Sequence, residues 1–268
     1  MLKKFEKICI QDVPVQHRDG WPGCDYTQNK YHETIVFFKR IAQTCQYLLD
    51  VFKISFLLSC RGLPMTIDWF HYMNLAGVAV CAISGTLMAY QKRMDGFGVI
   101  VLAAATAIGG GTLRDIMLDL PVFWVADPDY LYTTVVAALG TIVWLRFIDY
   151  FPYHYLLIAD AFGLALFNVV GMEKALTHGA AMSVAITMGT ITGVFGGMMR
   201  DVICREVPLV FSGELYASTC IAGGLMYAMF YYNGLPNAWS LLGALITTVL
   251  MRFASMRWHW QLPVFKSE

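Results

Sequence analysis

The sequence predicts an all-α polytopic membrane protein of seven transmembrane helices, arranged as two inverted three-helix repeats plus one extra helix. Apolar residues make up 57% of the 268 residues, and charged residues make up 14%, well below the roughly 25% of a soluble domain. The apolar residues gather in seven runs that are long enough to cross a bilayer. One motif with glycines and a charged pair occurs twice, in the second and in the fifth of these runs.

The first 65 residues differ from the rest because charged residues interrupt their helical periodicity. Their best apolar run, residues 54–60, is far short of the ~20 residues that a span needs. We expect residues 1–65 to be a poorly ordered extension made of a loop and a surface helix. Two explanations stay open: the extension is translocated despite its basic residues, or Met65 is the natural start and the extension is not native.

The spans are expected at residues 69–90, 97–118, 130–148, 154–175, 180–203, 211–232 and 236–256. Aromatic residues cluster at their ends, as in the interfacial belts of membrane proteins. The predicted domains are a first repeat over 66–150, a second repeat over 151–233, a seventh helix over 234–257 and a tail over 258–268.

Basic residues predict the orientation. One side of the predicted spans receives Lys92, Arg93, Arg146, Arg205, Arg252, Arg257 and Lys266. The other side, apart from the first 65 residues, receives Lys174 and little else. Cytoplasmic loops carry an excess of Lys and Arg, so we expect the C-terminus to lie in the cytoplasm.

An offset of 86 residues superimposes the first two spans on the fourth and the fifth without a gap. Arg114-Asp115 then falls on Arg200-Asp201, and the glycines before each pair coincide. Each unit holds three spans, so the second unit enters the membrane from the opposite side, which makes an inverted repeat. We therefore expect Arg114-Asp115 toward the outer face and Arg200-Asp201 toward the cytoplasmic face.

The glycine clusters are the first candidate site. Glycine weakens a helix, and an interrupted membrane helix presents carbonyl and N–H groups to ions. The residues expected at helix kinks along a pore are Gly109, Gly110, Gly111, Thr112, Gly193, Gly196 and Gly197. The alternative is that the glycines only let two helices pack closely, as small residues do in membranes. We favour the pore because the charged pair is repeated with them.

Charged and polar residues inside the spans are the other candidates, because ionisable groups at membrane depth are costly and usually functional. Arg114, Asp115, Arg200 and Asp201 are expected to form charged pairs near the pore. The secondary candidates are Asp160, Lys174, Asn168 and Ser84, of which the last two are expected to form hydrogen bonds between helices. Asp160 is alternatively a solvated residue at a helix end, and Lys174 alternatively extends to the interface.

The sequence offers no nucleophile–base pair, zinc motif or P-loop, so we expect no enzyme activity, no metal and no cofactor. The net charge is zero, which gives no reason to expect nucleic acid as a partner. Membrane lipid and small ions or solutes are the expected partners.

Two longer motifs resemble the bacterial family with paired "glycine transporter" domains, which is similar to the prokaryotic trimeric intracellular cation channels. The first repeat carries Lys92-Arg93-Met94-Asp95-Gly96-Phe97-Gly98 and Gly109-Gly110-Gly111-Thr112-Leu113-Arg114-Asp115. The second carries Gly196-Gly197-Met198-Met199-Arg200-Asp201 and Glu206-Val207-Pro208-Leu209. The resemblance implies a homotrimer in the bacterial inner membrane, with a pore for monovalent cations such as potassium in each subunit, lined by the kinked second and fifth helices.

A carrier for glycine or another small amino acid is the alternative function. Inverted repeats occur in carriers as well as in channels, so the symmetry does not decide between them. The two Arg-Asp pairs also suit the carboxylate and the ammonium group of a zwitterion. Both functions stay open at this stage.

Overall fold

The structure is a computed structural model that describes residues 69–147, 153–258 and 260. The extension expected over residues 1–65 lies outside the described residues, and so does most of the tail expected over 258–268. All the described residues belong to one compact unit, Asp68–Glu268.

Within this unit the fold is all-helical, as predicted. The long helices are α3 (Trp69–Gln91), α4 (Gly96–Met117), α6 (Asp129–Leu145), α7 (His154–Thr177), α8 (Met182–Ile203), α9 (Ala217–Tyr232) and α10 (Asn237–Trp258). Two short elements lie between them, α5 (Phe123–Ala126) and the 3-10 helix η1 (Leu209–Phe211). Five of the long helices are long and apolar enough to span a membrane, whereas α6 and α9 have 17 and 16 residues. The seven long helices of the described chain confirm the predicted fold class.

Local signals explain where several helices begin and end. Asp95 is the N-cap of α4, and its Oδ1 accepts a hydrogen bond from Gly98 N at 3.1 Å. Gly179 follows α7 with φ +80°, a conformation that favours glycine at the end of a helix. The span expected from residue 211 was wrong at its start, because α9 begins only at Ala217. Gly213 has φ +80° and cannot continue a helix there.

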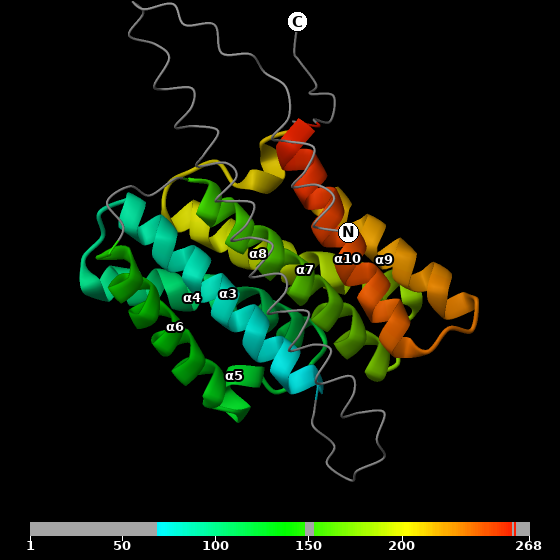
Figure 1. Cartoon of the computed structure of the whole chain (residues 1–268). Coiled ribbons are helices and arrows are strands. Elements are labelled where there is room, and N and C mark those ends of the chain that lie inside the picture. The colour runs from blue at the N-terminus through cyan, green and yellow to red at the C-terminus, as the bar shows by residue number, and fades with distance from the viewer. Residues whose placement is uncertain (1–68, 148–152, 259, 261–268) are drawn as a thin grey trace, which may run out of the picture. The chain divides into compact units, whose positions relative to one another are not determined.

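The two repeats have the same order of elements: α3, α4, α5 and α6 correspond to α7, α8, η1 and α9. Inside each repeat the first two helices pack together, α3 on α4 and α7 on α8. Between the repeats α3 packs on α7 and α4 on α8, while α10 packs on α9 and α7 (Figure 1). The interface between the repeats is therefore made of four helices related by the predicted symmetry.

Side-chain contacts define two ends of this bundle. At one end, which we call the Arg200 end, Lys92 after α3 contacts Glu206 after α8. At the other, the Arg114 end, Lys174 near the end of α7 contacts Asp115 near the end of α4. The two Arg-Asp pairs thus lie at opposite ends of the bundle, as the inverted repeat predicts.

Candidate functional site

The glycine clusters lie where α4 crosses α8. Both helices continue as α-helices through the glycines, so the expected interruption of the helices was wrong. A Cβ atom on Gly110 would lie 2.1 Å from the carbonyl oxygen of Thr192, and one on Gly196 would lie 2.5 Å from that of Thr106. These positions are equivalent in the two repeats, so the pseudo-two-fold axis passes through the crossing. Continuous helices keep their backbone groups paired in lipid, which interrupted helices would not, and the glycines let the two backbones approach closely.

Other glycines of the motifs make room for side chains that belong to the site. A Cβ on Gly111 would lie 2.5 Å from the ring of Phe123, and one on Gly197 would lie 2.8 Å from the hydroxyl of Tyr216. A Cβ on Gly193 would lie 2.8 Å from the carbonyl oxygen of Leu164. Gly109 is different, because its Cβ would meet Met199 at an ordinary 3.6 Å. Most of these glycines therefore act through space rather than through backbone flexibility.

Thr112 binds two partners from its place on α4. Its Oγ1 donates to the carbonyl oxygen of Ile108 at 2.7 Å and accepts from Nε1 of Trp124 at 2.9 Å. It thereby holds α5 against the end of α4.

The Arg114 cluster consists of Arg114, Asp115 and Lys174. Nε of Arg114 donates to Oδ1 of Asp115 at 2.8 Å, and Nζ of Lys174 lies 2.9 Å from the same oxygen. Oδ2 of Asp115 accepts from the backbone N–H of Phe123 at 2.9 Å. The side chains of Arg114 and Asp115 are 0% exposed. One buried carboxylate thus joins α4 to α7 and to the start of α5.

The Arg200 cluster consists of Arg200, Asp201, Asp160 and Ser84. Nε of Arg200 donates to Oδ1 of Asp201 at 2.8 Å, and Nη1 donates to Oδ1 of Asp160 at 2.8 Å and to Oγ of Ser84. Oδ2 of Asp201 accepts from the backbone N–H of Leu209 at 3.2 Å. Arg114 and Arg200 thus each contact the aspartate that follows them in the sequence, and Asp160 is a buried partner of Arg200.

The two clusters share their geometry but differ in charge. Asp201 repeats the contacts of Asp115, because Leu209 is the equivalent of Phe123 in the second repeat. The position equivalent to Asp160 is Asn74, and the position equivalent to Lys174 is Met88. The Arg114 cluster therefore has two cations and one carboxylate, a formal charge of +1. The Arg200 cluster has one cation and two carboxylates, a formal charge of −1.

The remaining candidates also have partners in neighbouring helices. Nδ2 of Asn168 donates to the carbonyl oxygen of Cys220 at 3.1 Å and to Oγ1 of Thr248 at 3.3 Å. These contacts join α7 to α9 and α10. Asn168 and Ser84 therefore each make a hydrogen bond to a neighbouring helix.

Arg252 was counted among the basic residues of one side of the predicted spans. It lies inside α10 and is fully buried. Its Nη1 donates to Oε2 of Glu214 at 3.2 Å, and its guanidinium lies 4.8 Å from the ring centroid of Tyr216. The position of Arg252 inside an apolar run was the one sign in the sequence that it is buried. Its partner Glu214 was not predictable, because residue 214 lies in the segment that was expected to be helical.

A third group with polar contacts lies at the Arg114 end, around His71. Candidate ligand atoms of His71, Asp127 and Asp129 lie within 4.8 Å of one another, close enough for one ion to contact all three. In the structure Nδ1 of His71 lies 3.1 Å from the hydroxyl of Tyr130 and 3.5 Å from Oδ2 of Asp127. Sequence spacing did not reveal this group, because its members come from α3 and from the start of α6.

Known proteins similar to this chain are membrane proteins, and a single family model matches the chain twice. A family model described as Glycine transporter matches residues 71–146 and 157–232. The UPF0126 inner membrane protein YadS of Escherichia coli (strain K12) is 45% identical over 197 residues, which cover 73% of this chain and 95% of that protein.

Solved structures with the same fold come from cation channels. The TRIC trimeric intracellular cation channel orthologue from Rhodobacter sphaeroides has a TM-score of 0.68 at 34% identity, over 71% of this chain and 98% of that chain. A structure that concerns conductance through TRIC cation channels has a TM-score of 0.66 at 33% identity, over 76% of this chain and 99% of that chain.

Proposed function

The chain belongs to the Glycine transporter family, and from this premise we propose that it is a channel for monovalent cations. The observation that carries the proposal is the likeness to the Rhodobacter sphaeroides cation channel, at 34% identity over 98% of that chain. The solved relatives named above are channels and not enzymes, in agreement with the prediction from the sequence. Potassium is the cation that we expect, as the resemblance to the prokaryotic cation channels implies.

The proposed path runs along α4 and α8 and connects the two charged clusters. The clusters lie at opposite ends of these helices and carry formal charges of opposite sign. A cation that passes along α4 and α8 meets attraction at the Arg200 cluster and repulsion at the Arg114 cluster. The Lys174–Asp115 contact is then the point that limits conduction, because it adds the second positive charge at that end.

The proposed setting is the inner membrane of a bacterium, with the chain as a multi-pass homotrimer whose C-terminus lies in the cytoplasm. The relative from Escherichia coli is an inner membrane protein by name, and the relative from Rhodobacter sphaeroides is trimeric by name. Five described helices are long and apolar enough to span. Lipid then surrounds each trimer, and each subunit has its own path.

A carrier for glycine is the second candidate, and the nitrogen atoms of Arg114 that are unpaired within the described chain favour it. Nη1 and Nη2 of Arg114 are buried and have no hydrogen-bond partner among the described residues. A guanidinium group in this state is suited to bind a carboxylate with two parallel hydrogen bonds. The nearby carboxylate of Asp115 would then compensate part of the charge.

Purified full-length protein in a planar bilayer tests the two functions. We expect potassium currents that are ohmic or weakly voltage-dependent and that need no glycine. Proteoliposomes loaded with potassium and supplied with labelled glycine are the parallel assay. Saturable glycine uptake without any cation current would refute the channel and support the carrier.

A further inference from the structure

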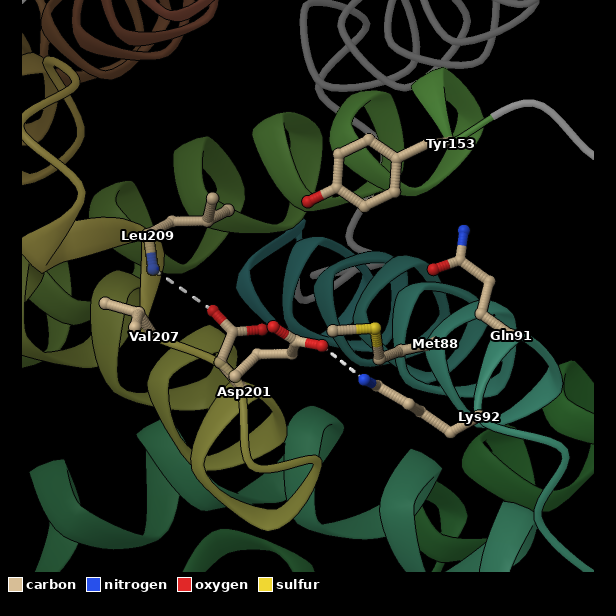
Figure 2. Close-up of a pocket in the computed structure, with 8 residues that line it drawn as sticks. Met88, Gln91, Lys92, Tyr153, Asp201, Val207 and Leu209 are labelled. Carbon is tan, nitrogen blue, oxygen red and sulfur yellow. Dashed lines mark hydrogen bonds and ion pairs between the residues drawn. The ribbon is translucent and has the colours of Figure 1, made fainter.

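A pocket of about 410 Å³ opens at the Arg200 end of the bundle. It is lined by Met88, Gln91, Lys92, Tyr153, Asp201, Glu206, Val207 and Leu209. At ~30 Å³ per water this volume holds roughly a dozen water molecules, so a cation fits with most of its hydration shell. Figure 2 shows Asp201 and Lys92 bordering this space, and the oxygen atoms of Tyr153 and Gln91 turned toward it.

The lining suits a monovalent cation by its chemistry. Potassium is coordinated by oxygen atoms in channels, and the pocket offers carboxylate, amide and phenol oxygens from Asp201, Glu206, Gln91 and Tyr153. Two contacts hold Asp201 at the inner wall: Oδ1 accepts from Arg200 and Oδ2 from the backbone N–H of Leu209. A carboxylate has about four lone-pair sites, so Asp201 keeps acceptor capacity for a cation.

The charge balance of the pocket lacks one positive charge. The charged groups that line it are Lys92, Asp201 and Glu206. Two buried charged groups stand behind them: Arg200, which is bonded to Asp201, and Asp160, which is bonded to Arg200. With ordinary protonation these are two cations and three carboxylates, a formal charge of −1. One monovalent cation would neutralise the set.

The inverted repeat explains why this end is open. At the Arg114 end, Lys174 reaches Asp115 from inside a helix and adds a second positive charge beside it. The equivalent position at the Arg200 end is Met88, which lines the pocket and brings no charge. A lysine still reaches the pocket, but it comes from the loop after α3: the ammonium of Lys92 contacts Oε1 of Glu206.

We propose that this pocket is a binding site for a permeating monovalent cation, and that the ammonium of Lys92 is a tethered competitor for it. The side chains of Lys92 and Glu206 are 35% and 49% exposed, so the contact is a solvated ion pair that opens readily. When Lys92 turns away, its ion pair with Glu206 opens. A cation from solution then takes the place of the ammonium beside the Glu206 carboxylate. When Lys92 returns, it repels the cation toward solution or along the path.

This inference rests on the proposed channel, and it adds a named site and a competitor at its mouth. The test compares Lys92→Met with Arg205→Asn. Both variants remove one positive charge at the same end, but Arg205 does not line the pocket. Arg205 has φ +57°, which asparagine tolerates, so the control substitution keeps the backbone. Neither residue belongs to the buried charged clusters.

We expect Lys92→Met to raise the potassium current several-fold at low salt and to lower the KCl concentration for half-maximal current. Glu206→Gln should lower the current, and Arg205→Asn should resemble the native protein. The difference should shrink toward 1 M KCl, where the Debye length is only about 3 Å.

Chemical modification of a cysteine at position 92 changes the charge there in a protein that has already folded, so a folding defect cannot account for the result. Lys92→Cys should behave like Lys92→Met until 2-aminoethyl methanethiosulfonate restores an ammonium group there and lowers the current again. The negatively charged sulfonatoethyl reagent should raise the current, and the native protein with the same reagents is the control for its own cysteines. If the native protein conducts and neither substitution nor modification of Lys92 changes the current beyond Arg205→Asn, the pocket proposal is wrong and the channel stands. If the native protein carries no cation current, both proposals fail together.

Discussion

Alanine at Gly110 is the sharpest test of the helix crossing. The added Cβ would lie 2.1 Å from the carbonyl oxygen of Thr192, whereas ordinary contact begins at 3.4 Å. The helices α4 and α8 must therefore separate by about 1.3 Å along this line. Both atoms belong to helix backbones, so no side chain can rotate away to relieve the clash.

The expected cost follows from this separation. Overpacking of a well-packed site costs about 1–3 kcal/mol, and replacing glycine by alanine within a helix returns about 0.8–1 kcal/mol. The net loss therefore lies between about 0 and 2 kcal/mol, and we expect the upper half of this range, about 1–2 kcal/mol, because both clashing atoms belong to helix backbones. At about 2–4 °C per kcal/mol for a chain of this size, the Tm in detergent should fall by roughly 2–8 °C.

Gly140 on α6 is the matched control, because a Cβ there would have no atom within 4 Å. Gly140→Ala should keep or raise the Tm through helix propensity alone. Thermal unfolding of the purified protein, followed by size-exclusion chromatography of the soluble fraction, measures both variants. A Gly110→Ala protein as stable as Gly140→Ala would refute the close crossing of α4 and α8.

The symmetry of the crossing adds an internal check. Gly196→Ala should lower the Tm in the same direction but less, because its Cβ would lie 2.5 Å from the carbonyl oxygen of Thr106. The double variant of Gly110 and Gly196 should lose less than the two single losses added together. One separation of the helices relieves both clashes, and neighbouring changes that share a backbone shift are not additive.

Three further predictions concern charge. The Arg200→Ala variant should lose about 3–5 kcal/mol of stability, because two buried carboxylates lose their cation. Arg205 is exposed, so Arg205→Ala should change the stability by less than ~0.5 kcal/mol. Equal, mild effects of the two substitutions in thermal unfolding would contradict the buried cluster. The hydrogen bond with Glu206 raises the pKa of Lys92 above its ordinary value of 10.5, so the ammonium stays charged at every pH below that value. The ratio of the Lys92→Met current to the native current should therefore stay constant from about pH 7 to pH 9. A ratio that falls toward 1 in this range would show that Lys92 has become neutral. A reporter fused after Ser267 should show cytoplasmic signal by the positive-inside rule, and periplasmic signal would reverse the assignment of the two ends.

The arrangement of helices was predictable because it depends on local properties of the chain. Hydrophobic length alone locates a span in a bilayer, and α3, α4, α7 and α8 lie within a few residues of their predicted positions. The pairing of Arg114 and Arg200 with aspartates was also predictable, because a buried cation in a membrane needs a carboxylate. The start of α9 was not, because the 3-10 turn before it follows from backbone conformation at Gly213 rather than from hydropathy.

The sequence by itself determined the membrane class, the seven helices and the inverted repeat, because hydropathy and the offset of 86 residues are properties of the chain order. Only the tertiary structure decided what the glycines do, since Gly110 and Thr192 meet across two helices that lie far apart in the sequence. It also decided which cation meets which carboxylate: Lys174 with Asp115, and Arg252 with Glu214. Such contacts depend on the rotation and depth of each helix against its neighbours, and packing sets both of these.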